Sequence, residues 1–177
     1  ALDAGIIHHL QPAIHVPRTR RHFDLRVPDR LGRDRRIVLV PLRAENIPLG
    51  VKSVQAFRKL SGRDVRLKIV GDGSLRYKYL KRFKDKDWIE WGVWSKDVEK
   101  EYHNADVLLV TSNYEGWGLT AVESVACGTP VVISPVGVAN EFIQNGINGF
   151  VARGHDVINI CEALYNCMTH HFNESSI

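Results

Sequence analysis

The sequence has no apolar run long enough to cross a bilayer and no segment with the pattern of a signal peptide. Its three cysteines, Cys127, Cys161 and Cys167, are odd in number and lack the spacing of metal ligands. These absences argue against a membrane-spanning protein, a disulfide scaffold and a cysteine-ligated metal domain. We therefore expect reduced thiols, no transmembrane segment and a cytoplasmic protein.

The chain has 177 residues, of which 44% are apolar and 25% are charged. This length suffices for one hydrophobic core but is too short for two full Rossmann domains. The composition therefore predicts one main globular domain of the kind found in enzymes.

Positive charge is concentrated at the start of the chain. Residues 1–36 hold 8 of the 24 Lys and Arg and 4 of the 20 Asp and Glu, which leaves 16 against 16 for the remainder. An arginine-rich arm can bind nucleic acid or an anionic membrane surface. Because Arg18 to Arg36 lacks interleaved aromatics and helical periodicity, we favour a solvated linker and expect no nucleic-acid partner; a salt-dependent gel shift would reveal one.

From Ile37 onward, segments typical of strands alternate with segments typical of helices, which predicts an α/β fold with a doubly wound parallel sheet of about six strands, covered on both faces. The strands are expected at Ile37–Leu42, Leu67–Val70, Trp88–Trp91, Val107–Thr111, Val131–Ile133 and Phe150–Val151, and the helices at Gly50–Leu60, Leu75–Phe83, Ser95–Asn104, the segment after Gly118 and Asp156–Met168.

The segment Asn113–Asn148 contains the clearest functional pattern. The apolar run before it, Val107–Val110, is typical of a strand buried on both faces. Gly116 and Gly118 then allow close backbone approach and unusual dihedral angles, and a helix follows. The first amides of such a helix have no partner inside the helix and suit a phosphate.

Two carboxylates flank this helix start. Glu115 precedes it and Glu123 lies about one turn inside it. Beside a phosphate they would repel a nucleotide unless they accepted hydrogen bonds from hydroxyls, which a nucleotide sugar offers on both sugar rings; each such bond contributes roughly 1.5 to 3 kcal/mol. The other interpretation is that Glu115 caps the helix and Glu123 is an ordinary surface residue. The residues alone leave both open.

The string from Glu115 to Glu123 resembles the E-x7-E signature of the retaining glycosyltransferases of family 4, and a Gly-x-Pro-Val-Val segment follows it at Gly128–Val132. Three further segments resemble the same family: Ile69–Gly73, Ala105–Asp106 and Glu141–Phe150. The resemblance covers roughly Ile37 to Leu164. It implies the nucleotide-sugar-binding, Rossmann-like half of an enzyme with the two-domain GT-B fold.

The resemblance also implies roles for individual residues. Glu123 would accept hydrogen bonds from the ribose hydroxyls, Glu115 would contact the donor sugar near its reacting carbon, and Arg43 would neutralise the departing diphosphate. The backbone amides of Gly116, Trp117 and Gly118 would hold the sugar, those of Leu119 and Thr120 the diphosphate, and Gly92, Val93 and Trp94 the base.

One position departs from the family pattern. The family has a lysine six residues after the arginine, directly before a glycine, and here Leu49 precedes Gly50. Lys52 lies three residues further on. Either Lys52 substitutes for that lysine, another cation comes from elsewhere, or activity is reduced, because the missing charge would stabilise the departing diphosphate.

The implied function is that of a retaining, metal-independent hexosyltransferase without a cofactor, using a UDP- or GDP-linked sugar. Residues 1–17 resemble the end of a preceding acceptor domain, 18–35 would form the linker, and 36–177 the donor domain. A glycan or lipid-linked acceptor would bind through the absent N-terminal half, which leaves peripheral contact with the cytoplasmic membrane face open. We expect this piece alone to bind donor weakly and turn over nothing. The alternative is a non-catalytic interaction module with the same fold.

Overall fold

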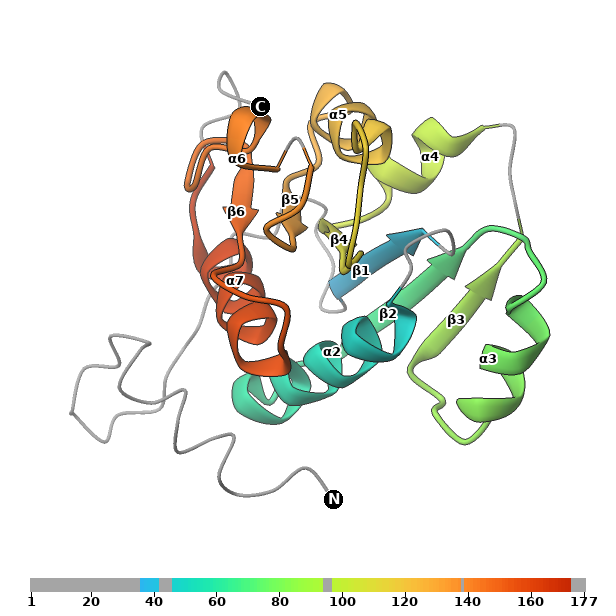
Figure 1. Cartoon of the computed structure of the whole chain (residues 1–177). Helices are drawn as coiled ribbons and strands as arrows, with labels where there is room; N and C mark the ends of the chain where they lie inside the picture. The colour runs from blue at the N-terminus through green and yellow to red at the C-terminus, as the bar shows by residue number, and fades with distance from the viewer. Residues whose placement is uncertain (1–35, 42–45, 94–96, 138, 173–177) are drawn as a thin grey trace, which may run out of the picture.

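The computed structural model describes residues 36–41, 46–93, 97–137 and 139–172. In this part of the chain, six strands form one parallel sheet (Figure 1). They are β1 (Arg36–Pro41), β2 (Val65–Val70), β3 (Ile89–Gly92), β4 (Val107–Val110), β5 (Val131–Ile133) and β6 (Gly149–Val151). The predicted α/β fold with a parallel sheet is confirmed.

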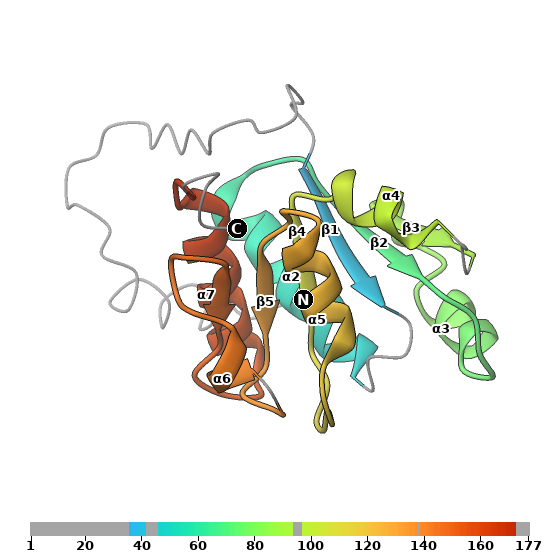
Figure 2. The same cartoon turned by 90° about the horizontal axis from the view of Figure 1, so that it is seen from above.

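The helices alternate with the strands along the chain and cover both faces of the sheet (Figures 1 and 2). They are α2 (Ile47–Ser61), α3 (Arg76–Arg82), α4 (Val98–His103), α5 (Leu119–Ala126), α6 (Ala139–Phe142) and α7 (Val157–Thr169).

The strand order is β3-β2-β1-β4-β5-β6. The chain therefore adds strands in one direction from β1 to β3, returns through α4 to the middle, and adds strands in the other direction from β4 to β6. The order reverses between β1 and β4. In open α/β sheets, ligands bind in the crevice outside the carboxyl ends of the strands at such a switch point.

Strand β4 divides its side chains between two cores. Val107 and Leu109 pack into the core formed with α2, α3 and α7, whereas Leu108 and Val110 pack into the core with α4, α5 and α6. All four side chains are fully buried. The continuous apolar run therefore reflects a central strand with one core on each face, as the sequence predicts.

Helix α2 begins at Ile47, three residues before the predicted start at Gly50. The Asn46 side chain caps it by accepting a hydrogen bond from the Leu49 amide, and proline occupies its first turn, where no amide donor is needed. Gly62 ends the helix in the left-handed conformation, with φ of 67°. The expectation failed at the start because the cap lies inside a polar segment without helical periodicity.

Two further differences concern short elements. Helix α6 was not predicted, because its four residues span only one turn and show no periodicity. Helix α4 is preceded by Asp97, which makes no side-chain capping bond, and the predicted cap Ser95 lies outside the described residues. In the described part of the chain, no helix is long and apolar enough to span a bilayer.

Candidate functional site

The amino end of α2 is fastened to the carboxyl end of β4, beside the switch point. Thr111, directly after β4, donates a hydrogen bond from its hydroxyl to the Asn46 carbonyl at 3.0 Å. The Asn46 side-chain amide donates to the Asn113 side-chain oxygen at 3.2 Å. The start of one helix is thereby fixed beside the loop that leads to the next.

Helix α5 begins at the same edge of the sheet. Gly118 precedes it in the left-handed conformation, with φ of 58° and ψ of 43°, and its carbonyl accepts from the Ala121 amide at 2.8 Å. The amides of Leu119 and Thr120, two residues and one residue before Ala121, have no acceptor within the helix because they belong to its first turn. The arrangement expected for anion binding is therefore present in α5.

Of the two predicted glycines, only Gly118 needs its conformational freedom. Gly116 does not have a positive φ, and a Cβ atom built on it would have nothing within 4 Å. The unusual dihedral angle that glycine allows at position 116 is therefore not adopted as a positive φ. The open space beside Gly116 agrees with close approach by a ligand, and the neighbouring Trp117 side chain is 79% exposed.

The close backbone approach occurs at Gly137, after β5. A Cβ atom there would lie 2.5 Å from the Glu115 carbonyl oxygen and 2.9 Å from that of Gly116. Gly137 also has φ of 51°, a conformation that L side chains rarely adopt. The loop carrying Glu115 therefore rests on a backbone that has no room for a side chain.

A buried hydroxyl holds the Glu115 side chain. Ser112, fully buried after β4, donates to Glu115 Oε1 at 2.7 Å. The carboxylate is half-buried, so its other oxygen keeps capacity for a further donor. Glu115 therefore does not cap α5 and is anchored to the end of the central strand.

A second buried hydroxyl holds Glu123. Tyr102 on α4, 3% exposed, donates to Glu123 Oε2 at 2.9 Å. Burial, and then the hydrogen bond and charge of Glu123, raise the pKa of the Tyr102 hydroxyl far above its usual range. Tyr102 therefore remains a neutral donor, and the exposed Glu123 carboxylate is oriented by α4 while keeping acceptor capacity toward solvent.

Negative charge is concentrated near this second carboxylate. Burial, together with the charges of Glu99 and Glu123, raises the pKa of the Cys127 thiol. Cys127 is therefore a poor nucleophile at neutral pH. The chemistry available at this edge is hydrogen bonding by carboxylates and amides.

The predicted cationic residues are less well placed. Leu49 is 7% exposed and belongs to the core with α2 and α7, whereas Lys52 is exposed on α2. The Lys52 ammonium makes no hydrogen bond or ion pair with a residue that the structure describes. Arg43, the other expected diphosphate ligand, lies outside the described residues.

The expected base site lies along the same edge of the sheet. Gly92 ends β3, and its carbonyl accepts from Arg76 Nη1 at 2.6 Å. Val93, the next residue, is 71% exposed. Trp94 lies outside the described residues. Since β3 is two positions from β1, this part of the predicted site is separated from α5 by the width of β2 and β1.

Sequence reasoning missed the residues that support the site. Ser112 and Tyr102 orient the two carboxylates, and Gly137 gives the Glu115 loop its room. A usable signal existed for Tyr102, the aromatic residue among the charged residues of α4. For Gly137 no local signal identifies the contact, because its partner lies about twenty residues away in the sequence.

The comparisons with known proteins assign the chain to a family and agree with its fold. The family model described as glycosyl transferases group 1 matches residues 35–170. The chain belongs to this family. The D-inositol 3-phosphate glycosyltransferase of Mycobacterium marinum is 41% identical over 61 residues, which cover 34% of this chain and 13% of that protein. The group 1 chain thus spans a small part of the length of this curated relative.

Solved glycosyltransferase structures share the fold. The C-terminal domain of a glycosyl transferase group 1 family protein from Francisella tularensis has a TM-score of 0.61 and 16% identity, covering 76% of this chain and 80% of that chain. Anabaena HepE, in complex with UDP and glucose, has a TM-score of 0.61 and 18% identity, covering 77% and 41%. The group 1 domain therefore has the Rossmann-like fold of a GT-B glycosyltransferase half.

Proposed function

We propose that this group 1 domain binds the nucleotide diphosphate sugar in a retaining hexosyltransferase of family 4. The observation that carries the proposal is the anchoring of both carboxylates by buried hydroxyls, Ser112 for Glu115 and Tyr102 for Glu123. An ordinary surface acid has no need of a buried donor. A carboxylate that must accept hydrogen bonds from a sugar does, because its orientation then determines the strength of those bonds.

In this proposal each part of the carboxyl edge has one role. The ribose hydroxyls donate to Glu123, the hexose hydroxyls to Glu115, and the diphosphate accepts from the first amides of α5. The nucleotide is UDP or GDP, and the complex of Anabaena HepE with UDP and glucose supports the former. The hexose passes to an acceptor hydroxyl with its anomeric configuration kept.

The acceptor belongs to the proposal as well. A glycan or lipid-linked acceptor would bind to a separate N-terminal half, so residues 36–177 supply the donor side alone. The free cysteines among the described residues suit a reducing compartment, and we place the reaction in the cytoplasm.

Calorimetry with UDP and with GDP tests the proposal. One helix start and two carboxylates in half a cleft suggest roughly −4 to −6 kcal/mol, which corresponds to dissociation constants from about millimolar to tens of micromolar. Glu123→Gln should weaken binding about tenfold or more, because a charged hydrogen bond becomes a neutral one. Asp85→Asn, an exposed acid in the turn after α3, is the matched control. Equal affinities for wild type and Glu123→Gln would refute the ribose assignment.

A second candidate function is a non-catalytic interaction module. The observation that favours it is Leu49, which is buried in a core where the family has a lysine directed at the diphosphate. Donor hydrolysis or transfer by the chain joined to the N-terminal half of a group 1 glycosyltransferase distinguishes the two. Absence of turnover with every common nucleotide sugar, while UDP and GDP fail to bind, would favour the module.

A further inference from the structure

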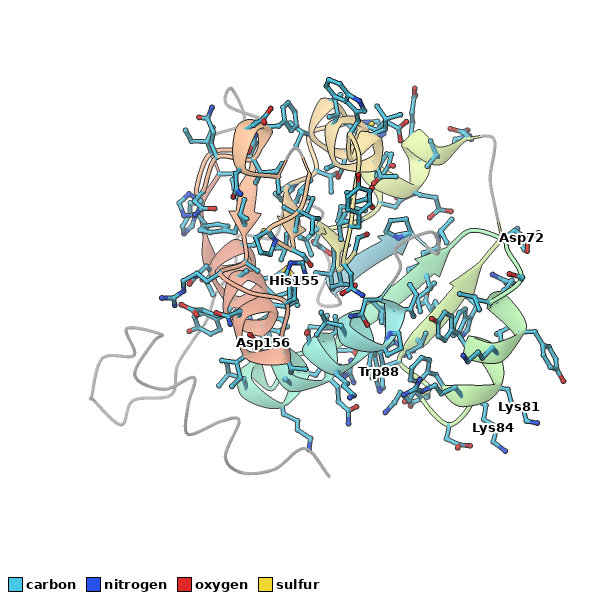
Figure 3. The ribbon with its side chains drawn as sticks, viewed as in Figure 1. Asp72, Lys81, Lys84, Trp88, His155 and Asp156 are labelled. Atoms are coloured by element: carbon cyan, nitrogen blue, oxygen red, sulfur yellow. The ribbon has the colours of Figure 1, made fainter. Side chains whose placement is uncertain are left out.

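A second charged surface lies at the end of the sheet away from the candidate site. Residues 76–87 hold six Lys and Arg and two Asp, whereas residues 37–177 as a whole are balanced. Figure 3 shows Lys81 and Lys84 projecting from the chain near the amino end of β3, while Asp72 lies at the other end of α3. We name this surface the basic edge; its members are Lys59, Lys78, Lys81, Arg82, Lys84 and Lys86.

Trp88 joins the two segments that carry these cations. It is 9% exposed at the start of β3, with Arg58 Cζ of α2 at 5.3 Å from its ring centroid and Lys86 Nζ at 5.5 Å. Lys86 Nζ also donates to Gln55 Oε1 of α2 at 3.0 Å. The carboxyl end of α2 and the turn after α3 therefore form one continuous surface.

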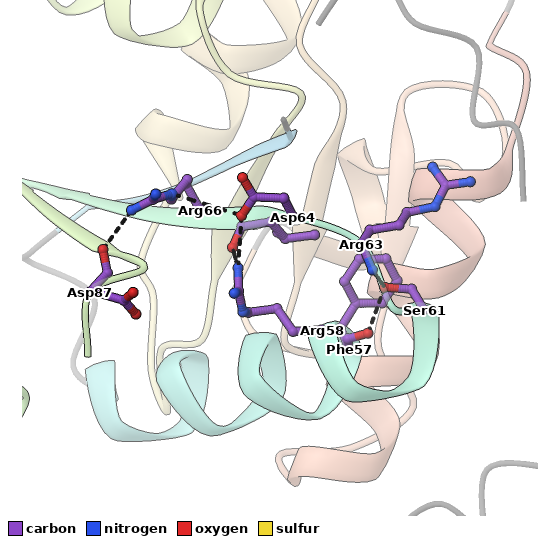
Figure 4. Close-up of polar contacts among 8 residues, drawn as sticks. Phe57, Arg58, Ser61, Arg63, Asp64, Arg66 and Asp87 are labelled. Atoms are coloured by element: carbon purple, nitrogen blue, oxygen red, sulfur yellow. Dashed lines mark hydrogen bonds and ion pairs between the residues drawn. The ribbon is translucent and has the colours of Figure 1, made fainter. Parts of the chain in front are cut away.

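Arg58 and Arg66 make hydrogen bonds and ion pairs with other residues of the domain (Figure 4). Arg58 donates to the Val65 carbonyl and lies 3.5 Å from Asp64, and Arg66 donates to the Asp87 carbonyl at 2.5 Å. The lysines remain outside: Lys59, Lys78, Lys81 and Lys84 are exposed. The acids in the same segments are Asp64, which pairs with the arginines, and the exposed Asp85 and Asp87.

An exposed aromatic residue accompanies the lysines. Tyr77 is 77% exposed and precedes Lys81 by four residues within α3, a spacing that places the two on one side of the helix. Lys84 follows in the turn after α3. Leu75, 47% exposed, precedes the helix. Lysine ammonium groups bind phosphates as point charges, and anionic lipid head groups present such phosphates across a surface. Exposed lysines beside an exposed tyrosine and leucine fit an extended anionic surface with an apolar interior.

We propose that the basic edge docks the domain on the surface of an anionic lipid bilayer. Lys78, Lys81 and Lys84 contact the lipid head groups, and Tyr77 lies at their level. This docking leaves the carboxyl edge, with Glu115 and Glu123, away from the membrane contact. It does not rest on the proposed donor binding, because it uses none of the same side chains.

Vesicle sedimentation of the full 177-residue chain tests the docking. The vesicles are neutral phosphatidylcholine, or phosphatidylcholine with about 25% phosphatidylglycerol. We expect binding to the second kind only, and its loss at about 0.5 M NaCl, where screening is strong. Lys81→Gln with Lys84→Gln should lower the partition coefficient about 25-fold, since each lysine contributes about fivefold.

The matched control removes two exposed cations elsewhere, Lys100→Gln with Arg153→Gln, and should bind as wild type. An equal fall of the partition coefficient in both double variants would overturn the proposal, because the net charge of the chain would then explain the binding. Full binding by the Lys81 and Lys84 variant would overturn it as well, and assign the contact to the arginine-rich start of the chain. The proposal is also overturned if the Lys81 and Lys84 variant loses binding to a single-stranded RNA oligonucleotide but still binds the anionic vesicles.

Discussion

Gly137→Ala should loosen the loop that carries Glu115 and weaken donor binding through a residue that does not contact the donor. The new Cβ would lie 2.5 Å and 2.9 Å from two backbone carbonyl oxygens, which cannot move aside as a flexible side chain would. The left-handed backbone costs an alanine about 1 to 2 kcal/mol, and overpacking costs about 1 to 3 kcal/mol more. Alanine also lowers the conformational entropy of the unfolded chain, which offsets roughly 0.4 to 1 kcal/mol of this loss in stability.

The expected net loss of unfolding free energy is therefore about 1 to 5 kcal/mol for Gly137→Ala. Gly62→Ala is the matched control, because Gly62 has φ of 67° and nothing within 4 Å of its Cβ position. Gly62→Ala should therefore lose only the unfolding free energy that the left-handed backbone costs an alanine. Urea denaturation measures the unfolding free energy of both variants, and calorimetry with a UDP-sugar measures affinity at a temperature where both remain folded.

The difference in unfolding free energy between Gly137→Ala and Gly62→Ala isolates the contact of Gly137 with the Glu115 loop. We expect Gly137→Ala to bind UDP-sugar several-fold more weakly than wild type, and Gly62→Ala to bind normally. The reasoning is refuted if Gly137→Ala loses no more stability than Gly62→Ala and retains wild-type affinity. In that case the loop would not depend on the room that Gly137 provides.

Three further predictions follow from single residues. Gly116→Ala should leave the unfolding free energy within about 0.5 kcal/mol of wild type but weaken UDP-sugar binding in calorimetry; normal binding would show that the donor does not approach this backbone. Leu49→Lys should lower stability by about 2 to 5 kcal/mol, because it puts a cation into the core, and UDP should raise the Tm of this variant more than that of wild type; wild-type stability would contradict the burial of Leu49. Burial, and then Glu162, raise the pKa of Cys161 from 9.0 to about 12, so the folded state keeps its proton and stability is lost as pH rises above 9. Urea titrations should show a loss of about 2 kcal/mol between pH 9 and pH 11 from this thiol, and Cys161→Ala should show a shallower decline; equal slopes would remove Cys161 as the cause.

The sequence predicts much of the fold because the signals are local. The apolar run Val107–Val110 is continuous, since a central parallel strand is buried on both faces, and the structure places it in the middle of the sheet. Helix α7 was predicted at Asp156–Met168, because its cap residue and periodicity lie within one segment; it spans Val157–Thr169. Elements without a local signal, such as the single turn of α6, were not predictable in this way.

The candidate site was predictable only in part. Glu115 and Glu123 stand out by their spacing around Gly118, which the structure confirms as the left-handed start of α5. Their supports are contacts between segments distant in sequence: Tyr102 reaches Glu123 from another helix, and Gly137 meets the Glu115 carbonyl from another loop. Such contacts depend on the strand order, which no single segment encodes.

Leu49 is a position where the packing explains a residue type that the family pattern does not. A pattern shows that a lysine is missing, but the packing shows why its replacement is apolar: the side chain contributes to the core between α2 and the sheet. Lys52 is exposed and able to move, so its contribution depends on the ligand. Affinity measurements on Leu49→Lys and on Lys52→Gln therefore address separate questions.

The central claim is that the amino end of α5 holds the donor between the two anchored carboxylates. The most direct measurement is an amide nitrogen–proton NMR titration of the chain with UDP-glucose, with assigned resonances. The account predicts that the largest shifts fall on the amides from Trp117 to Thr120, and that Glu123→Gln reduces them at equal ligand concentration. Saturable shifts concentrated away from these amides, or amides from Trp117 to Thr120 that stay unchanged at millimolar UDP-glucose and GDP-mannose, would contradict it.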